Sequence, residues 1–108
     1  MTQLTIHEAV GTVHIKIDGH AGYNPGNDIV CAAISTMCYA FINQLEAMYS
    51  REELEDLQII DEAGHIEIRL KKDMSRTGRQ YWNATRDYFI TGMEMIAEQF
   101  PDYLEVEG

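Results

Sequence analysis

The chain of 108 residues has only two cysteines and two prolines, and its apolar residues are broken up by polar ones. Two cysteines cannot build the disulfide framework of a small secreted domain. If Cys31 and Cys38 share one helix, two turns and roughly 10 Å separate them. That distance is too large for a disulfide, which requires Cα atoms within about 7 Å. Two free thiols are typical of a protein in a reducing compartment.

The sequence also lacks an apolar run approaching the roughly 20 residues that a membrane-spanning helix needs. The first stretch, MTQLTIHEAV, has neither the basic start nor the apolar block of a secretion signal. We therefore expect a cytoplasmic protein with no membrane partner.

Basic residues are scarce. Eight lysines and arginines stand against 18 aspartates and glutamates, which gives a formal net charge of −10. Nucleic acids and anionic membranes bind positive surfaces, so this balance argues against both as partners. A basic protein or peptide would suit it. The simpler explanation, which we favour, is that the acidity keeps the protein soluble, as it does in many cytosolic proteins.

The familiar patterns for metals and nucleotides are missing as well. His20, Asp28 and Cys31 together would leave a zinc ion one ligand short, and no paired cysteine or histidine spacing supplies the fourth. The glycines at positions 19, 22 and 26 fit neither a Walker phosphate loop nor a dinucleotide fingerprint. We therefore expect no metal site and neither of these two nucleotide-binding motifs.

What is present is enough for one folded domain over residues 1–108, with 45% hydrophobic and 24% charged residues. Alternating apolar and polar residues predict short strands, and apolar residues at helical spacing predict two long helices. The strands are expected at residues 4–7, 13–18, from 57, 66–71 and 103–106, and the helices at 28–49 and 77–99. A charged connection is expected at 51–56 and a turn at 61–64.

The predicted order is strand, strand, helix, strand, strand, helix, strand. Two long amphipathic helices against a mostly antiparallel sheet make a two-layer α+β domain. The two halves share this rhythm without matching residues, so the chain is not a sequence repeat.

The stretch GHAGYNPGNDIVCAAIS, residues 19–35, concentrates reactive residues before the first long helix. Asp28 is a good N-cap, which would place Cys31 in the first helical turn. Free N–H groups and a partial positive charge favour a thiolate there. His20, on the preceding loop, could take the thiol proton. We interpret Cys31 as a nucleophile and His20 as its base.

Each of these residues also has a simpler interpretation. Cys31 could be a small buried apolar residue, as free cysteines often are, and this is the interpretation we adopt for Cys38. Asp28 could cap the helix or orient His20. Ser35, one turn beyond Cys31, could line a cleft or bond back to a helix carbonyl. His65, after a turn, is expected at the surface.

The motifs GHAGY at residues 19–23 and DIVCAAIS at 28–35, with IAEQFPDYL at 96–104, resemble the ribosomal-processing cysteine protease family, Prp. The resemblance covers the whole chain. It implies that His20 and Cys31 form a catalytic dyad. It also implies an endopeptidase that removes a short N-terminal extension from a large-subunit ribosomal protein, acting as a homodimer without a cofactor.

We assign Gly19, Gly22, Asp28 and Ser35 to supporting or substrate-binding roles. Backbone N–H groups around Cys31 and in the loop are expected to stabilise the oxyanion. The segment 24–27, which the resemblance implies gates the cleft, is slightly shorter than is usual in the family.

Two alternatives remain at this point. One is a prophage-type paralogue that cleaves a phage protein. The other is a non-catalytic peptide-binding module of the same fold. Alkylation separates the second from a protease, because an active dyad makes Cys31 far more reactive than Cys38.

Overall fold

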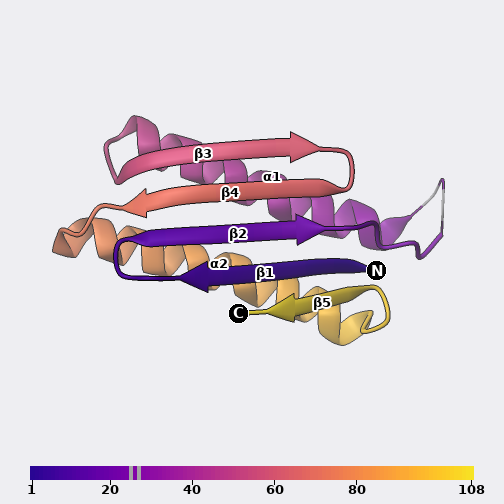
Figure 1. The fold of residues 1–108 in the computed structure, drawn as a ribbon. Helices are drawn as coiled ribbons and strands as arrows, with labels where there is room; N and C mark the ends of the chain where they lie inside the picture. The colour runs from indigo at the N-terminus through magenta and orange to yellow at the C-terminus, as the bar shows by residue number, and fades with distance from the viewer. Residues whose placement is uncertain (25, 27) are drawn as a thin grey trace.

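The structure is a computed structural model that describes residues 1–24, 26 and 28–108. The predicted loop residues Pro25 and Asn27 lie outside the described residues. Five strands and two helices follow one another in the predicted order (Figure 1). Their bounds are β1 Thr2–Glu8, β2 Thr12–Asp18, α1 Ile29–Ser50, β3 Leu54–Glu62, β4 His65–Lys72, α2 Arg76–Gln99 and β5 Leu104–Glu107.

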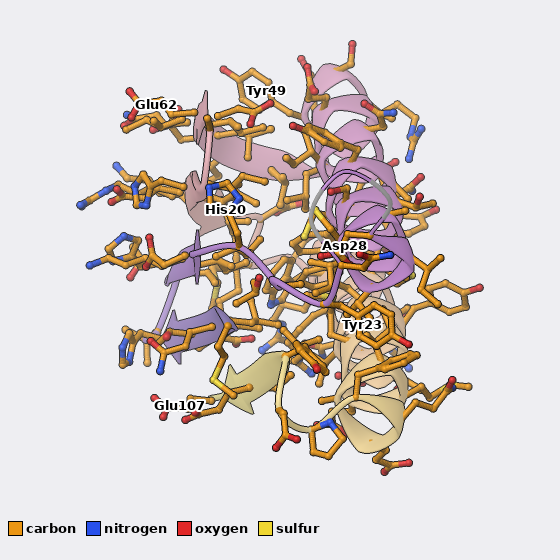
Figure 2. All side chains as sticks on the ribbon, turned by 90° about the vertical axis from the view of Figure 1, so that its right-hand side faces the viewer. His20, Tyr23, Asp28, Tyr49, Glu62 and Glu107 are labelled. Atoms are coloured by element: carbon orange, nitrogen blue, oxygen red, sulfur yellow. The ribbon has the colours of Figure 1, made fainter. Side chains whose placement is uncertain are left out.

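The strands form one sheet in the order β3-β4-β2-β1-β5. All neighbours are antiparallel except β1 and β5, which run parallel because the chain crosses over through α2 before β5. Both helices cover the same face of this sheet, and the other face is open to solvent (Figures 1 and 2). The prediction of a two-layer α+β domain with a mostly antiparallel sheet is confirmed.

The core lies between the sheet and the two helices. Alternate residues of β1, β2 and β4 point into it, and α1 contributes a stripe from Val30 to Met48. Where the helices meet, Phe41 and Phe89 stack with ring centroids 4.0 Å apart and planes inclined by 3°. This packing fixes α1, and therefore its N-terminus, against the sheet.

By length and composition alone, α1 could cross a bilayer, which corrects the expectation from the sequence that no segment would qualify. The reason is that its few polar residues are uncharged or lie near its end. The core helix of a globular domain can have the same length and composition. Here the apolar stripe of α1 packs against α2 and β3.

Two predicted boundaries were wrong. β3 begins at Leu54, so the connection after α1 is only Arg51–Glu53, closed by the Glu53 N–H donating to Met48 O at 2.8 Å. β3 also continues through Glu62, which leaves Ala63 and Gly64 as a two-residue turn. Acidic residues at both ends of an edge strand hid its alternation, and the positive φ of Gly64 permits the tight turn.

We predict that Phe89→Ala lowers the free energy of unfolding by about 3–5 kcal/mol, since it empties the centre of the helix–helix contact. Tyr88→Ala is the matched control because this neighbouring aromatic residue is 80% exposed whereas Phe89 is 1% exposed. It should change stability by less than about 0.5 kcal/mol. Urea unfolding followed by circular dichroism measures both, and equal losses would contradict the described packing.

Candidate active site

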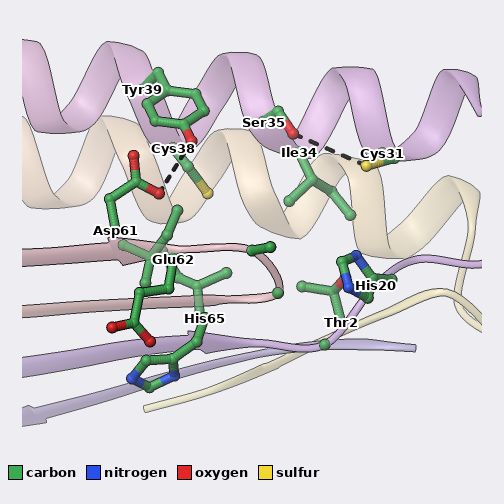
Figure 3. Close-up of a pocket in the computed structure, with 15 residues that line it drawn as sticks. Thr2, His20, Cys31, Ile34, Ser35, Cys38, Tyr39, Asp61, Glu62 and His65 are labelled. Carbon is green, nitrogen blue, oxygen red and sulfur yellow. Dashed lines mark hydrogen bonds between the residues drawn. The ribbon is translucent and has the colours of Figure 1, made fainter.

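A cleft of about 290 Å³ opens between the first turns of α1, the end of β2 and the β3–β4 turn (Figure 3). Four of the predicted site residues line it, namely Gly19, His20, Cys31 and Ser35. The structure does not place the other two, Gly22 and Asp28, among the lining residues. Sequence segments that are far apart in the chain thus meet at one site.

Cys31 lies on the helix side of the cleft. Asp28 is the N-cap of α1, with φ −93° and ψ 100°, and its Oδ1 accepts the Cys31 N–H at 2.8 Å. Cys31 is therefore in the first turn, as predicted, and it is half-buried. Its Sγ lies 3.9 Å from the Ser35 Oγ within hydrogen-bonding geometry (Figure 3). A thiol here faces both the cleft and the positive end of a helix.

The Ser35 hydroxyl therefore lines the cleft beside the thiol. The back-bond to a helix carbonyl that we considered for Ser35 is made by its neighbour, since Thr36 Oγ1 donates to Ala32 O at 2.9 Å.

Asp28 acts as a cap. Its second oxygen, Oδ2, accepts the Tyr23 N–H at 2.9 Å, so one carboxylate holds both the helix start and the loop. Hydrogen bonds from backbone N–H groups, first of all that of Cys31, lower the pKa of Asp28. Within the described ranges, no hydrogen bond joins Asp28 to His20, and Figure 2 shows His20 beside the sheet and Asp28 at the helix.

The oxyanion donors expected at Cys31 need correction. The Cys31 N–H is taken by Asp28 Oδ1, and the Ala32 N–H donates to Asp28 O at 3.0 Å. Neither is free for a substrate, because the capping side chain binds the first N–H group and the first intrahelical hydrogen bond uses the second.

His20 lies on the sheet side of the cleft, just beyond β2 (Figure 3). It is exposed, and Gly19 before it has a φ of +94° that turns the chain toward the helix. In the described part of the chain, no hydrogen bond joins His20 to Cys31. Catalytic hydrogen bonds often tighten only when substrate is bound, so this geometry is compatible with a dyad.

Cys38 is buried, with 1% exposure, as predicted. Burial, and to a smaller extent the charge of Asp61, raises the pKa of its thiol to about 12. The two thiols of α1 therefore differ in their surroundings, since Cys31 faces the cleft at the helix start and Cys38 is buried within the helix.

The sequence analysis missed the contribution of the β3–β4 hairpin. Its residues Asp61, Glu62, Gly64 and His65 line the far wall of the cleft. Nothing in their local pattern marks them, because only the β2–β4 register, with Asp18 opposite His65, brings them to the site.

His65, expected at the surface, is a half-buried residue with two acidic partners. Its Nδ1 contacts Asp18 Oδ1, and its Nε2 lies 3.3 Å from Glu67 Oε2. The hydrogen bond to Asp18, and then that to Glu67, raises the pKa of His65. Hydrogen bonds from His14, Arg69 and His65 lower the pKa of Glu67 to about 2.

Among the described residues, no group of three acidic, histidine or cysteine side chains is arranged to hold a metal.

We predict a pH-dependent stability from the Asp28 cap. Its carboxylate is favoured in the folded state, so its contribution is complete above the ordinary pKa of about 3.9 and is lost as pH falls through the lower folded value. Asp28→Ala should lower Tm by a few degrees at pH 7. That difference from the wild type should shrink below about pH 4. Asp28→Asn, which keeps one acceptor oxygen, should lose less, and a Tm gap that widens in acid would contradict the assignment.

Comparison with known proteins identifies the family of this chain. The family model described as "Cysteine protease Prp" matches residues 1–105. The ribosomal processing cysteine protease Prp of Bacillus subtilis (strain 168) is 25% identical over 109 residues, which cover 98% of this chain and 96% of that protein.

Two crystal structures share the fold. The ribosomal processing protease Prp from S. aureus with a covalently linked product peptide superposes with a TM-score of 0.73 at 24% identity, covering 99% of this chain and 98% of that one. The same S. aureus protease with a substrate peptide gives a TM-score of 0.72 at 21% identity over 100% of both chains. Since the family model spans nearly all of the sequence, the chain belongs to the Prp family of ribosomal-processing cysteine proteases and is a cysteine peptidase.

Proposed function

We propose that this chain removes a short N-terminal extension from a large-subunit ribosomal protein, with Cys31 as nucleophile and His20 as its base. One observation carries the assignment of the dyad. The only cysteine that is not buried lies at a helix start and shares a cleft with a histidine supplied by a separate element. This is the arrangement that activates a thiol for attack.

In the proposed reaction, His20 takes the proton from Cys31 Sγ, and the thiolate adds to the carbonyl carbon of the scissile peptide bond. The negative charge on the carbonyl oxygen develops near the positive end of α1 and is stabilised by N–H groups of the loop. When the C–N bond breaks, His20 returns its proton to the leaving amine. Water then adds to the thioester, which releases the new carboxylate and restores the thiol.

Peptide recognition is supported by the relatives and by charge. The S. aureus protease was crystallised with a substrate peptide and with a product peptide. In this chain, Asp61 and Glu62 line the cleft, and the net charge is −10. Ribosomal proteins bind RNA and are correspondingly basic, so an acidic protease has a complementary substrate.

We further propose that the protease acts in the cytoplasm and that, as the family resemblance implies, it is a homodimer without a cofactor. Size-exclusion chromatography with light scattering tests the dimer directly.

The function is tested by incubating the protein with the large-subunit ribosomal protein of the same organism, carrying its N-terminal extension. Mass spectrometry should show one new N-terminus with the wild type and none with Cys31→Ser. If Cys31 reacts readily with iodoacetamide but the extension stays intact, the protease has another target, such as a phage protein. Cutting that persists in Cys31→Ser would remove Cys31 from the mechanism.

A further inference from the structure

The structure assigns a positioning role to Gly64 in the β3–β4 turn. Because Gly64 has no side chain, the His20 imidazole can occupy the space beside it. The inference deepens the proposed function, since it takes His20 to be the base. Gly64 stands 44 positions after His20 in the sequence, and only the fold brings the two together.

The contact is close. A Cβ added at Gly64 would lie 2.8 Å from His20 Nε2, 3.2 Å from Cε1 and 3.5 Å from Cδ2. Real Cβ atoms essentially never approach another heavy atom within 3.0 Å. Any side chain at position 64 therefore displaces the ring from its present place.

The backbone around this contact is fixed on both sides. Gly19 N–H donates to Gly64 O at 2.8 Å, which joins the residue before His20 to the turn. Gly19 itself has a φ of +94°, and a Cβ there would overlap the carbonyl oxygen of Met1. The β2–β4 ladder continues directly from this point through the pair Asp18 and His65. The loop and the turn therefore hold one another, and the His20 side chain is the part that is free to move.

Because the backbone is held and the His20 ring can move, a side chain added at position 64 should shift the ring rather than disrupt the fold. His20 is exposed, so its ring can swing away from a new methyl group with little loss of packing. The fold should survive, while the base leaves its present place on the wall of the cleft that it shares with the thiol. General-base catalysis requires a heavy-atom distance of about 2.6–3.2 Å, and a misplacement of about 1 Å can cost roughly 100-fold in rate.

The test is Gly64→Ala, with Gly11→Ala as the matched control. Gly11 lies in the β1–β2 turn with a φ of +84°, close to the +75° of Gly64, but a Cβ there meets nothing within 4 Å. Both variants place an alanine at a similar positive φ, so both should lose a few degrees of Tm. Only Gly64→Ala should lower kcat, by about 10- to 100-fold.

A second readout separates displacement of the base from a blocked cleft. Iodoacetamide is small, so its rate at Cys31 reports the thiolate rather than peptide binding. Between pH 6 and 9, this rate in Gly64→Ala should shift toward the profile of His20→Ala, while Gly11→Ala follows the wild type. Gly64→Asn, which tolerates a positive φ but carries a Cβ, should behave like Gly64→Ala and serves if the alanine variant fails to fold.

The two hypotheses fail in different ways. If His20→Ala cleaves as well as the wild type, the proposed dyad is wrong. If His20→Ala is inactive but both Gly64 variants keep the wild-type kcat and alkylation profile, only the positioning role is overturned. Equal loss of kcat in Gly11→Ala would also overturn it, since strain in a distant turn would then suffice.

Discussion

Replacing Cys31 with serine should lower kcat/KM for the ribosomal protein extension by about 10⁴-fold or more, as removal of a catalytic nucleophile does in other hydrolases. The hydroxyl is close in size to the thiol and leaves the Asp28 cap in place, because that bond uses the Cys31 backbone N–H. What is lost is a thiol, whose sulfur is a far better nucleophile than a hydroxyl oxygen. A serine hydroxyl beside a single histidine has no comparable tendency to give up its proton.

Cys38→Ala is the control that isolates this chemistry. It removes the other thiol of α1, which is 1% exposed and packs in the core. Stability should fall, but cleavage should remain of the wild-type order at a temperature where the variant is folded. Circular dichroism establishes folding, and cleavage is followed by mass spectrometry. If Cys31→Ser retains a tenth of wild-type activity, Cys31 is not the nucleophile.

The periodicity of the sequence was enough to predict the element order and the layers, because most strands here have one wet face and both helices have one buried face. It failed at β3, where Leu54 and Asp56 flank a register irregularity and no clean alternation exists. It could not reveal the parallel pairing of β1 with β5 either. That pairing depends on where α2 returns the chain, which is a property of the packed domain.

Part of the candidate site could also be predicted from the sequence and part could not. The predictable part lies within one stretch, where a helix cap, a helix start and a loop histidine follow one another, and it comprises His20, Asp28, Cys31 and Ser35. Gly64 and His65 could not be predicted as site residues, because the sequence of a hairpin turn does not show which distant residues contact it. The cap also explains the error about the oxyanion. A capping side chain binds the N–H of the second or third helical residue, and Cys31 is the third, so the cap predicted from the sequence already argued against a free Cys31 N–H.

The second large effect expected is a difference in reactivity between the two thiols. At pH 7, iodoacetamide should label Cys31 at least about 10³-fold faster than Cys38, because the thiolate is the reacting species. With a pKa of about 12, Cys38 has only about one thiolate in 10⁵ molecules at this pH, and its sulfur is also shielded from the reagent. Cys31 is half-buried, faces the cleft and stands at a helix start.

His20→Ala should then slow the labelling of Cys31 by about tenfold at pH 7, since the imidazole would no longer stabilise the ionised sulfur. His7→Ala is the control, because His7 is an exposed residue of β1 that does not line the cleft. Peptide mass spectrometry over a time course gives both rates in one sample. Equal, slow labelling of the two cysteines would indicate a binding module without an activated thiol. Fast labelling of Cys31 that is indifferent to His20 would keep the nucleophile but require another base.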